Sequence, residues 1–225
     1  MNISVITLFP EIIEGYFGCS IMKRAVEKGL ISYRAVDLKL FADGRFHRCD
    51  DYPYGGGAGL VMKPEPFERA LHSLQHNGKT AVVYPTPSGK LLTHEKAIGL
   101  AQYDELVFLC GRYEGIDQRI IDLYVNEEIS VGDYVLSSGE VASLVIIDAV
   151  YRHIDGVISG ESLKEESFSD CALLEYPQYT RPEVFHGLRV PEILLSGNHG
   201  EIEKWRYQKR VEKTLKNRPE LIDKK

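Results

Sequence analysis

The sequence predicts an α/β fold in which a largely parallel sheet is covered by helices. Short apolar runs typical of buried strands alternate with segments whose apolar residues recur at helical spacing. Two glycine-bearing loops follow such apolar runs, as loops do at the carboxyl ends of strands in open α/β sheets. With 225 residues and 44% hydrophobic content, the chain can bury a full core. This order indicates strands joined by helical crossovers.

The first elements are predicted to be a strand, a helix and a second strand. Residues 2–8 are apolar enough for a buried strand, and Pro10 suits the first turn of a helix. We expect this helix to stop at Gly29 and a strand to follow at 31–36. One helical stripe is formed by Ile13, Phe17, Ile21 and Ala25.

Residues 37–63 are rich in turn-forming residues and are predicted to be a loop. The elements after this loop are predicted, in order, to be a helix from Pro66 to about His76, a strand near Ala81–Tyr84, a helix around Thr93–Ala101, a strand at Glu105–Cys110, a short strand at Glu127–Ile129 and a helix at Glu140–His153.

The polar segment from Asp155 to Glu175 has little periodicity and is predicted to be a linker. We therefore divide the chain into a first domain at residues 1–158, a linker at 159–174 and a small helical C-terminal domain at 175–225.

Composition narrows the class of protein. The start of the chain lacks the basic segment and apolar run of a signal peptide, and the longest apolar stretch, Val141–Val150, is too short to span a membrane. We expect a cytoplasmic protein with no membrane segment. The four cysteines are widely spaced, which argues against a zinc cage or a redox pair, and we predict no metal ligands among them.

Charge is distributed unevenly along the chain. The net charge is −6, yet residues 199–225 hold nine Lys or Arg against five Asp or Glu. Five basic residues would share a face if this segment is a helix: Arg206, Lys209, Arg210, Lys213 and Lys216. Such a face is usually solvated, and it indicates phosphate contacts only if another feature points to RNA.

The two glycine loops predict a binding site. The first, Gly111–Asp117, follows the apolar run at 106–110, and the second spans residues 130–140. Glycine at such positions lets backbone groups approach a ligand closely. Neither loop carries a lysine, so a phosphate ligand is disfavoured.

Several familiar chemistries are excluded by spacing. The chain has no P-loop pattern, its glycine run at 55–59 does not match the dinucleotide fingerprint, and no Gly-x-Ser-x-Gly elbow is present. What remains is a lysine-free pocket with Tyr84, Pro85, Tyr113 and Tyr134 at its expected rim. Such a pocket suits an adenine-bearing ligand held by backbone groups and stacking.

These loops, taken with three other motifs, resemble the bacterial TrmD family of tRNA (guanine-N1)-methyltransferases. The matching segments, in chain order, are Asp51–Gly57, Gly111–Asp117, Gly132–Ser137, Tyr179–Val184 and Leu194–His199. The resemblance runs from Ile3 to about Leu221. It implies a SPOUT methyltransferase domain with a trefoil knot and a homodimer with the active site at the subunit interface.

The resemblance also implies a methyl donor, a substrate and a set of contacts. The donor is S-adenosyl-L-methionine, the substrate is the guanosine immediately 3′ of the anticodon in tRNA, and the family suggests a role for Mg²⁺. The C-terminal domain of the family grips the tRNA. By motif, the donor-binding residues are Tyr84, Pro85, Thr86, Pro87, Gly111, Tyr113, Glu114, Gly115, Val131, Gly132, Asp133, Tyr134, Val135, Leu136, Ser138 and Gly139. Ser138 departs from the glycine usual in the family.

Methylation of guanine N1 needs a base to remove the N1 proton and a cation to stabilise charge on O6. The resemblance places the cation at Arg152 and the base at Glu166. The usual residue at the second position is aspartate, and Asp170 is a nearby substitute.

Each of these residues also has an ordinary structural interpretation. Arg152 could favour a helix dipole, Glu166 could be a solvated acid, and Glu114 could pair with Arg112. Two other classes also stay open, a SPOUT enzyme acting on another RNA and a non-catalytic RNA-binding module. Methyl-donor binding would exclude the module, and mapping the methylated nucleoside would separate the two enzymes.

Overall fold

The computed structural model describes residues 1–75, 78–160, 166–169 and 173–222. The chain divides into two compact units, Met1–Ile158 and Ser159–Lys225. Each unit is described by itself.

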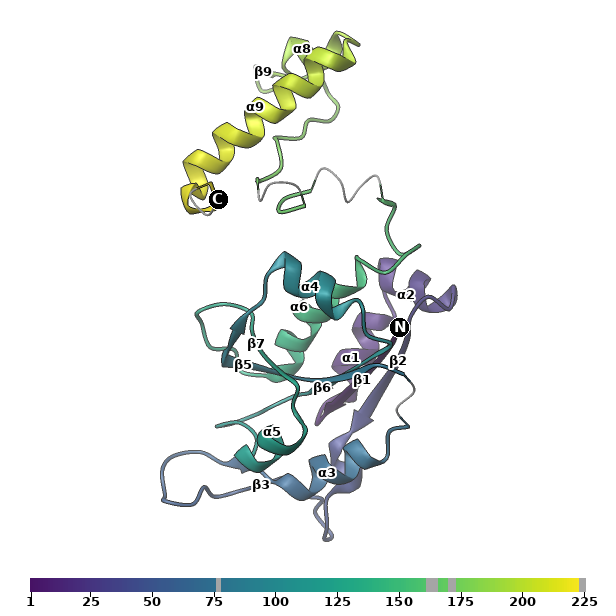
Figure 1. Cartoon of the computed structure of the whole chain (residues 1–225), viewed down its shortest axis with the longest axis vertical. Helices are drawn as coiled ribbons and strands as arrows, with labels where there is room; N and C mark the ends of the chain where they lie inside the picture. The colour runs from purple at the N-terminus through teal and green to yellow at the C-terminus, as the bar shows by residue number, and fades with distance from the viewer. Residues whose placement is uncertain (76–77, 161–165, 170–172, 223–225) are drawn as a thin grey trace. The chain divides into compact units, whose positions relative to one another are not determined.

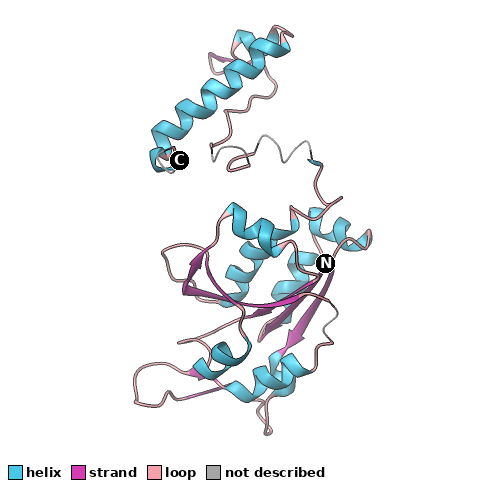
Figure 2. Ribbon diagram, in the orientation of Figure 1, coloured by secondary structure: helices cyan, strands magenta, loops and turns pink. Residues whose placement is uncertain are grey.

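The first unit is built on a five-stranded parallel sheet with the strand order β2-β1-β6-β5-β7 (Figures 1 and 2). The strands are β1 (Asn2–Thr7), β2 (Ser32–Asp37), β5 (Thr80–Leu91), β6 (Glu105–Leu109) and β7 (Glu127–Ser130). Because every neighbouring pair is parallel, the carboxyl ends of all five strands lie at one edge of the sheet. This result confirms the predicted α/β class with a parallel sheet.

Helices cover both faces of this sheet, as Figure 2 shows. One face carries α1 (Pro10–Phe17), α2 (Ser20–Glu27), α4 (His94–Leu100) and α6 (Gly139–Tyr151), and the other carries α3 (Pro64–His72) and α5 (Gln118–Tyr124).

Side-chain alternation along the central strands creates two cores. In β6, Leu106 and Phe108 belong to the core under α1 and α6, whereas Val107 and Leu109 belong to the core under α3 and α5. All four are fully buried, as expected for a parallel strand covered on both faces. The sheet is thereby held between two helical layers. This packing also fixes the carboxyl ends of the strands, where the loops that follow them begin.

The single helix predicted from Pro10 toward Gly29 is wrong. The structure has two helices, because Cys19 is extended and Ser20 adopts a positive φ of 51° between α1 and α2. The apolar stripe continues across the break, with Phe17 and Ala25 both buried, so the spacing of apolar residues does not reveal it.

Other boundaries differ from the predictions as well. Helix α3 begins at Pro64 rather than Pro66 and ends at His72, while the predicted end, His76, lies outside the described residues. Strand β5 continues far beyond Tyr84, with an irregularity between Pro85 and Lys90 where it pairs with β7. The predicted loop at 37–63 contains the 3-10 turn η1 (Leu38–Phe41) and a short antiparallel ladder of β3 (Asp50–Asp51) and β4 (Val61–Met62). Helix α5 was not predicted.

The second unit is organised around one long helix, α9 (His199–Asn217), with the short elements β8 (Val184–Phe185), β9 (Leu188–Arg189), α8 (Glu192–Leu195) and η2 (Pro219–Leu221). The side chain of Asn198 caps α9 by accepting from the amide of Glu201 at 3.4 Å. Thr214 is buried, and its hydroxyl accepts from the amide of Leu174 at 2.9 Å. The helix is therefore fastened to the segment that leads into it.

Residues 199–217 form the predicted helix, but the five basic residues that would share a face do not all face solvent. Arg210 is buried, and the guanidinium of Arg206 lies over the ring of Tyr176 at 4.8 Å. These two residues lie one helical turn apart on the inner side, with Thr214 after them, so only part of the basic set faces outward. Lys213 and Lys216 are exposed.

In the part of the chain that the structure describes, no helix combines the length and the apolar character needed to cross a membrane.

Candidate functional site

A cavity of about 290 Å³ opens at the carboxyl edge of the sheet in the first unit. It is formed by the irregular middle of β5, the loop after β6, the loop after β7 and the first turn of α6. Its lining residues are Tyr84, Pro85, Thr86, Pro87, Gly111, Arg112, Tyr113, Glu114, Gly115, Ile129, Ser130, Val131, Gly132, Tyr134, Val135, Leu136, Ser137, Ser138, Gly139 and Ala142. This is the edge at which open α/β sheets hold their ligands.

The two glycine loops do converge on this cavity. All of the predicted donor-binding residues line it except Asp133, which is exposed on the second loop. The sequence reading missed Arg112, Ile129, Ser130, Ser137 and Ala142, which also line it. Four of these five lie within or directly beside the two loops, so a wider window around each loop would have included them.

Two glycines of the first loop allow a buried tyrosine to form the cavity floor. A Cβ atom at Gly111 or at Gly115 would lie 3.1 Å from atoms of the Tyr84 side chain. Gly115 also has a φ of +119°, which only glycine adopts without strain. Burial raises the pKa of the Tyr84 phenol, while hydrogen bonds with the backbone of Ile116 and with Thr86 act in the opposite direction. The phenol is therefore a neutral hydrogen-bonding group at neutral pH.

The second loop presents an aromatic ring. The side chain of Tyr134 packs over Gly132, in the space that a Cβ atom would need, and its hydroxyl donates to the carbonyl oxygen of Val131 at 3.0 Å. Tyr113 in the first loop is more than half exposed and has a φ of 57°. Both rings are available for stacking on a planar ligand.

Behind the cavity, the end of β1, the loop after β6 and the start of α6 meet at a buried carboxylate. Glu140 lies in the first turn of α6 and is fully buried, and its Oε1 accepts from the hydroxyl of Thr7 at 2.6 Å. Its Oε2 lies 3.2 Å from Nε of Arg112, within ion-pair distance but without the alignment of a hydrogen bond. The Arg112 guanidinium also lies over the ring of Phe9 at 4.4 Å.

The suggested pairing of Arg112 with Glu114 is therefore wrong. The carboxylate of Glu114 lies against Gly59 instead, and its amide donates to the carbonyl oxygen of Leu60 at 3.1 Å. The guanidinium of Arg112 is largely buried, and its partner is the fully buried carboxylate of Glu140. A buried charge needs such a partner, because an unpaired one is costly.

The predicted catalytic residues lie in different units. Arg152 is half-buried at the C-terminal end of α6, where a cation is favoured by the helix dipole, and it does not line the cavity. Glu166 is half-buried in the second unit, where its carbonyl oxygen accepts from the hydroxyl of Ser169 at 2.7 Å. The substitute base, Asp170, lies outside the described residues.

Ser138 occupies the N-cap position of α6 and is buried. Its φ of −155° and ψ of 141° are extended values that any residue adopts, so the change from glycine costs no backbone strain.

Comparison with known proteins agrees with this geometry. The family model described as tRNA (Guanine-1)-methyltransferase TrmD matches residues 1–224. A tRNA (guanine-N(1)-)-methyltransferase of Treponema denticola is 62% identical over 224 residues, covering 100% of this chain and 91% of the relative. Proteins of the same name are 57% identical in Borrelia hermsii, with 98% and 92% coverage, and 55% identical in Treponema pallidum, with 99% and 88% coverage. The chain belongs to the TrmD family of tRNA (guanine-1)-methyltransferases.

Proposed function

We propose that this protein transfers a methyl group from S-adenosyl-L-methionine to N1 of the guanosine immediately 3′ of the anticodon in tRNA. The observation that carries the proposal is the cavity itself, because the glycine loops expected to bind the donor converge there in a member of this methyltransferase family.

The lining of the cavity fits such a donor. Four glycines and three tyrosines are among its lining residues, and no lysine is among the described residues that line it, as suits a ligand with an adenine ring and a sulfonium centre. Tyr113 and Tyr134 offer faces for the adenine, and a sulfonium is also attracted to aromatic faces. Glu114 supplies a carboxylate at the wall for a cationic group. When bound, the donor supplies the methyl group for an in-line displacement.

The chain must supply the proton chemistry. We assign Glu166 as the base that accepts the N1 proton of guanine and Arg152 as the cation that stabilises negative charge on O6. The half-buried Glu166 is consistent with a carboxylate that can reach a substrate, and Arg152 follows the helix that starts at the cavity. A homodimer with the active site at the subunit interface would bring together groups that one chain holds in separate units.

The proposal extends to the rest of the molecule. The family resemblance supports a SPOUT domain with a trefoil knot at residues 1–158, a linker at 159–174 and a tRNA-binding domain at 175–225. Exposed Lys213 and Lys216 on α9 are suitable phosphate contacts. The site of action would be the cytoplasm, where tRNA is found.

Mg²⁺ has no assigned ligands in this proposal. Among the described residues, no group of three or more His, Cys, Asp or Glu side chains is arranged to hold a metal ion. We therefore assign no step to it.

One experiment tests donor, substrate and product together. The purified protein is incubated with tRNA transcripts and isotopically labelled S-adenosylmethionine, and the digested RNA is analysed by mass spectrometry for N1-methylguanosine. A matched transcript carries adenosine in place of the guanosine 3′ of the anticodon. We expect label in the first transcript only. Label in both, or in another nucleoside, would indicate a SPOUT enzyme with a different RNA target, and binding of RNA without donor binding would indicate a non-catalytic module.

A further inference from the structure

Behind the cavity described above lies a buried ion pair whose two members come from different segments of the chain. Arg112 belongs to the loop after β6, and Glu140 is the last residue of the second glycine loop and lies in the first turn of α6. Thr7, at the carboxyl end of β1, donates to the Glu140 carboxylate and accepts from the amide of Phe9 at 2.9 Å. One buried carboxylate thus connects the end of β1 with the segments that follow β6 and β7.

The same arginine reaches the second loop as well. Its Nη1 lies 3.5 Å from the carbonyl oxygen of Ser137, at the limit of a hydrogen bond, and its backbone amide lies 3.2 Å from the sulfur of Met62. Arg112 therefore contacts Ser137 on the second loop and Met62 of β4, besides Glu140.

We propose that the Arg112–Glu140 pair, oriented by Thr7, is a positioning device that sets the separation of the two cavity walls for the methyl donor. The inference rests on the proposed function, since the donor is the ligand assigned to that cavity. Glu140 and Thr7 are both fully buried, and neither lines the cavity. They act on a ligand only through Arg112 and the loops.

Stability alone does not account for this pair. Desolvating a carboxylate and a guanidinium costs free energy that their attraction repays only in good geometry, and an apolar pair of similar volume is often as stable or more so. The N-terminus of α6 favours an anion at position 140, which offsets part of that cost for Glu140. The Glu140 carboxylate also has a fixed direction that an apolar side chain would lack, because the Thr7 hydroxyl holds Oε1 while Oε2 faces Arg112.

The first test uses two variants that cannot touch the ligand. In Glu140→Gln the amide keeps an acceptor for Thr7 but removes the charge opposite Arg112, and Thr7→Val removes only the hydroxyl. We expect each to raise both the Kd for S-adenosylmethionine, measured by calorimetry, and its KM about tenfold or more, as loss of a supporting contact does in other preorganised sites. The kcat at saturating donor should stay within about threefold of wild type, since the reacting groups are unchanged.

The second test separates positioning from stability. Removing one partner leaves the other charge buried and unpaired, so Arg112→Met and Glu140→Gln should each lower Tm. The double variant Arg112→Met/Glu140→Gln buries no charge at this point, so its Tm should recover toward wild type. Donor affinity should not recover. Recovery of both would show that the pair serves stability only, and the inference would be overturned.

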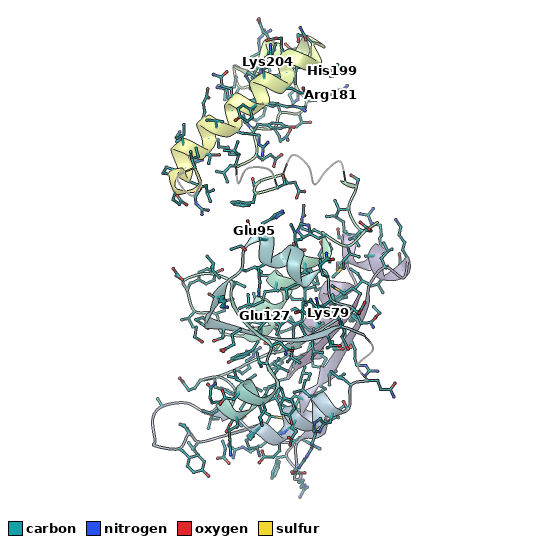
Figure 3. All side chains as sticks on the ribbon, in the orientation of Figure 1. Lys79, Glu95, Glu127, Arg181, His199 and Lys204 are labelled. Carbon is teal, nitrogen blue, oxygen red and sulfur yellow. The ribbon has the colours of Figure 1, made fainter. Side chains whose placement is uncertain are left out.

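A matched control is the ion pair between Lys96 of α4 and Glu127 of β7, at 2.6 Å, with side chains about one quarter exposed. Figure 3 labels Glu127. This pair joins a helix to a strand of the same sheet, yet neither residue lines the cavity. Lys96→Met should therefore change Tm without changing the Kd for the donor.

The two ways of failing are distinct. If wild-type protein gives no heat on titration with S-adenosylmethionine, the proposed function fails. If wild type binds the donor and Glu140→Gln and Thr7→Val bind it equally well, the proposed function stands and only the positioning role is wrong. Should Glu140→Gln not fold, Thr7→Val still decides the question, because it keeps both charges.

Discussion

The backbone of Gly139 rests directly on that of Gly111. The amide of Gly139 donates to the carbonyl oxygen of Gly111 at 2.9 Å, and a Cβ atom at position 139 would lie 2.6 Å from the Gly111 nitrogen and 2.9 Å from the Cα of Cys110. The start of α6 and the first glycine loop thus form one surface.

Replacing Gly139 with alanine should separate these two segments. We expect Gly139→Ala to destabilise the protein by about 1–3 kcal/mol through overpacking and to weaken donor binding, because the neighbouring atoms are backbone that cannot move aside. Chemical denaturation and calorimetry measure the two effects.

The control for this variant is Gly99→Ala in α4. A Cβ atom there meets nothing within 4 Å, so the substitution should stabilise by about 0.5–1 kcal/mol through helix propensity and leave donor binding unchanged. Equal donor affinity in Gly139→Ala and wild type would contradict the close packing seen here.

The proposed catalytic pair predicts a specific kinetic pattern. Arg152→Ala and Glu166→Ala should each lower kcat by at least about 10²-fold, since each removes a group acting in the transition state, while the Kd for the donor stays close to wild type. Single-turnover assays with labelled donor report the first quantity and calorimetry the second. Asp170→Asn is the comparison, because full turnover in Glu166→Ala with loss in Asp170→Asn would move the base to Asp170.

The N-cap of α5 predicts a pH-dependent contribution to stability. Asp117 caps this helix by accepting from the amide of Arg119 at 3.0 Å, and hydrogen bonding to the Arg119 guanidinium holds the pKa of the Asp117 carboxyl below its usual range. Because the folded pKa is lowered, the charged form stabilises the fold above the unfolded pKa of about 4, and this contribution disappears as the pH falls through the folded pKa.

Asp117→Asn keeps the capping oxygen and removes the charge. We expect its Tm to lie below that of wild type at pH 7 and the difference to shrink as the pH is lowered toward 3. Asp117→Ala should be about 1 kcal/mol less stable than Asp117→Asn at all these pH values, because it also removes the capping oxygen. A pH-independent difference for Asp117→Asn would refute the role of the ionised carboxylate.

Thiol reactivity should follow burial. Cys19 is exposed, whereas Cys49 and Cys110 are buried, and burial raises the pKa of both buried thiols. In a Cys19→Ser/Cys171→Ser variant, a disulfide reagent at pH 8 should react slowly with the native protein and quickly after unfolding in guanidinium chloride. A fast reaction with two thiols in the native state would show that the core around them opens readily.

Periodicity identified the parallel sheet and most crossovers, yet it did not show where the chain changes direction. The break between α1 and α2 leaves the apolar stripe intact, and Ser20 takes a positive φ without a glycine to announce it. Strand β5 passes through Pro85 and Pro87, which normally argue against a strand. Helix α5 buries only Ile120 and Ile121, too few positions to produce a pattern.

The candidate site was more accessible to sequence reasoning, because glycine loops after strands point to one edge of a sheet. The partner of Arg112 was not, since Glu140 is 28 positions away and Glu114 is near in sequence. Contacts between residues far apart in the sequence depend on how distant chain segments come together in the fold, and a short stretch of sequence does not contain that information. The burial of part of the basic face of α9 could not be predicted for the same reason, because the aromatic ring beside Arg206 belongs to Tyr176, 30 positions earlier in the chain.

No lysine is among the described residues that line the cavity, and the arginine that lines it, Arg112, forms an ion pair with Glu140. Electrolyte screens interactions between formal charges at a surface and has little effect on amide dipoles and ring stacking. On the proposed function, raising the ionic strength should therefore weaken tRNA contacts at Lys213 and Lys216 while leaving binding of the methyl donor nearly unchanged.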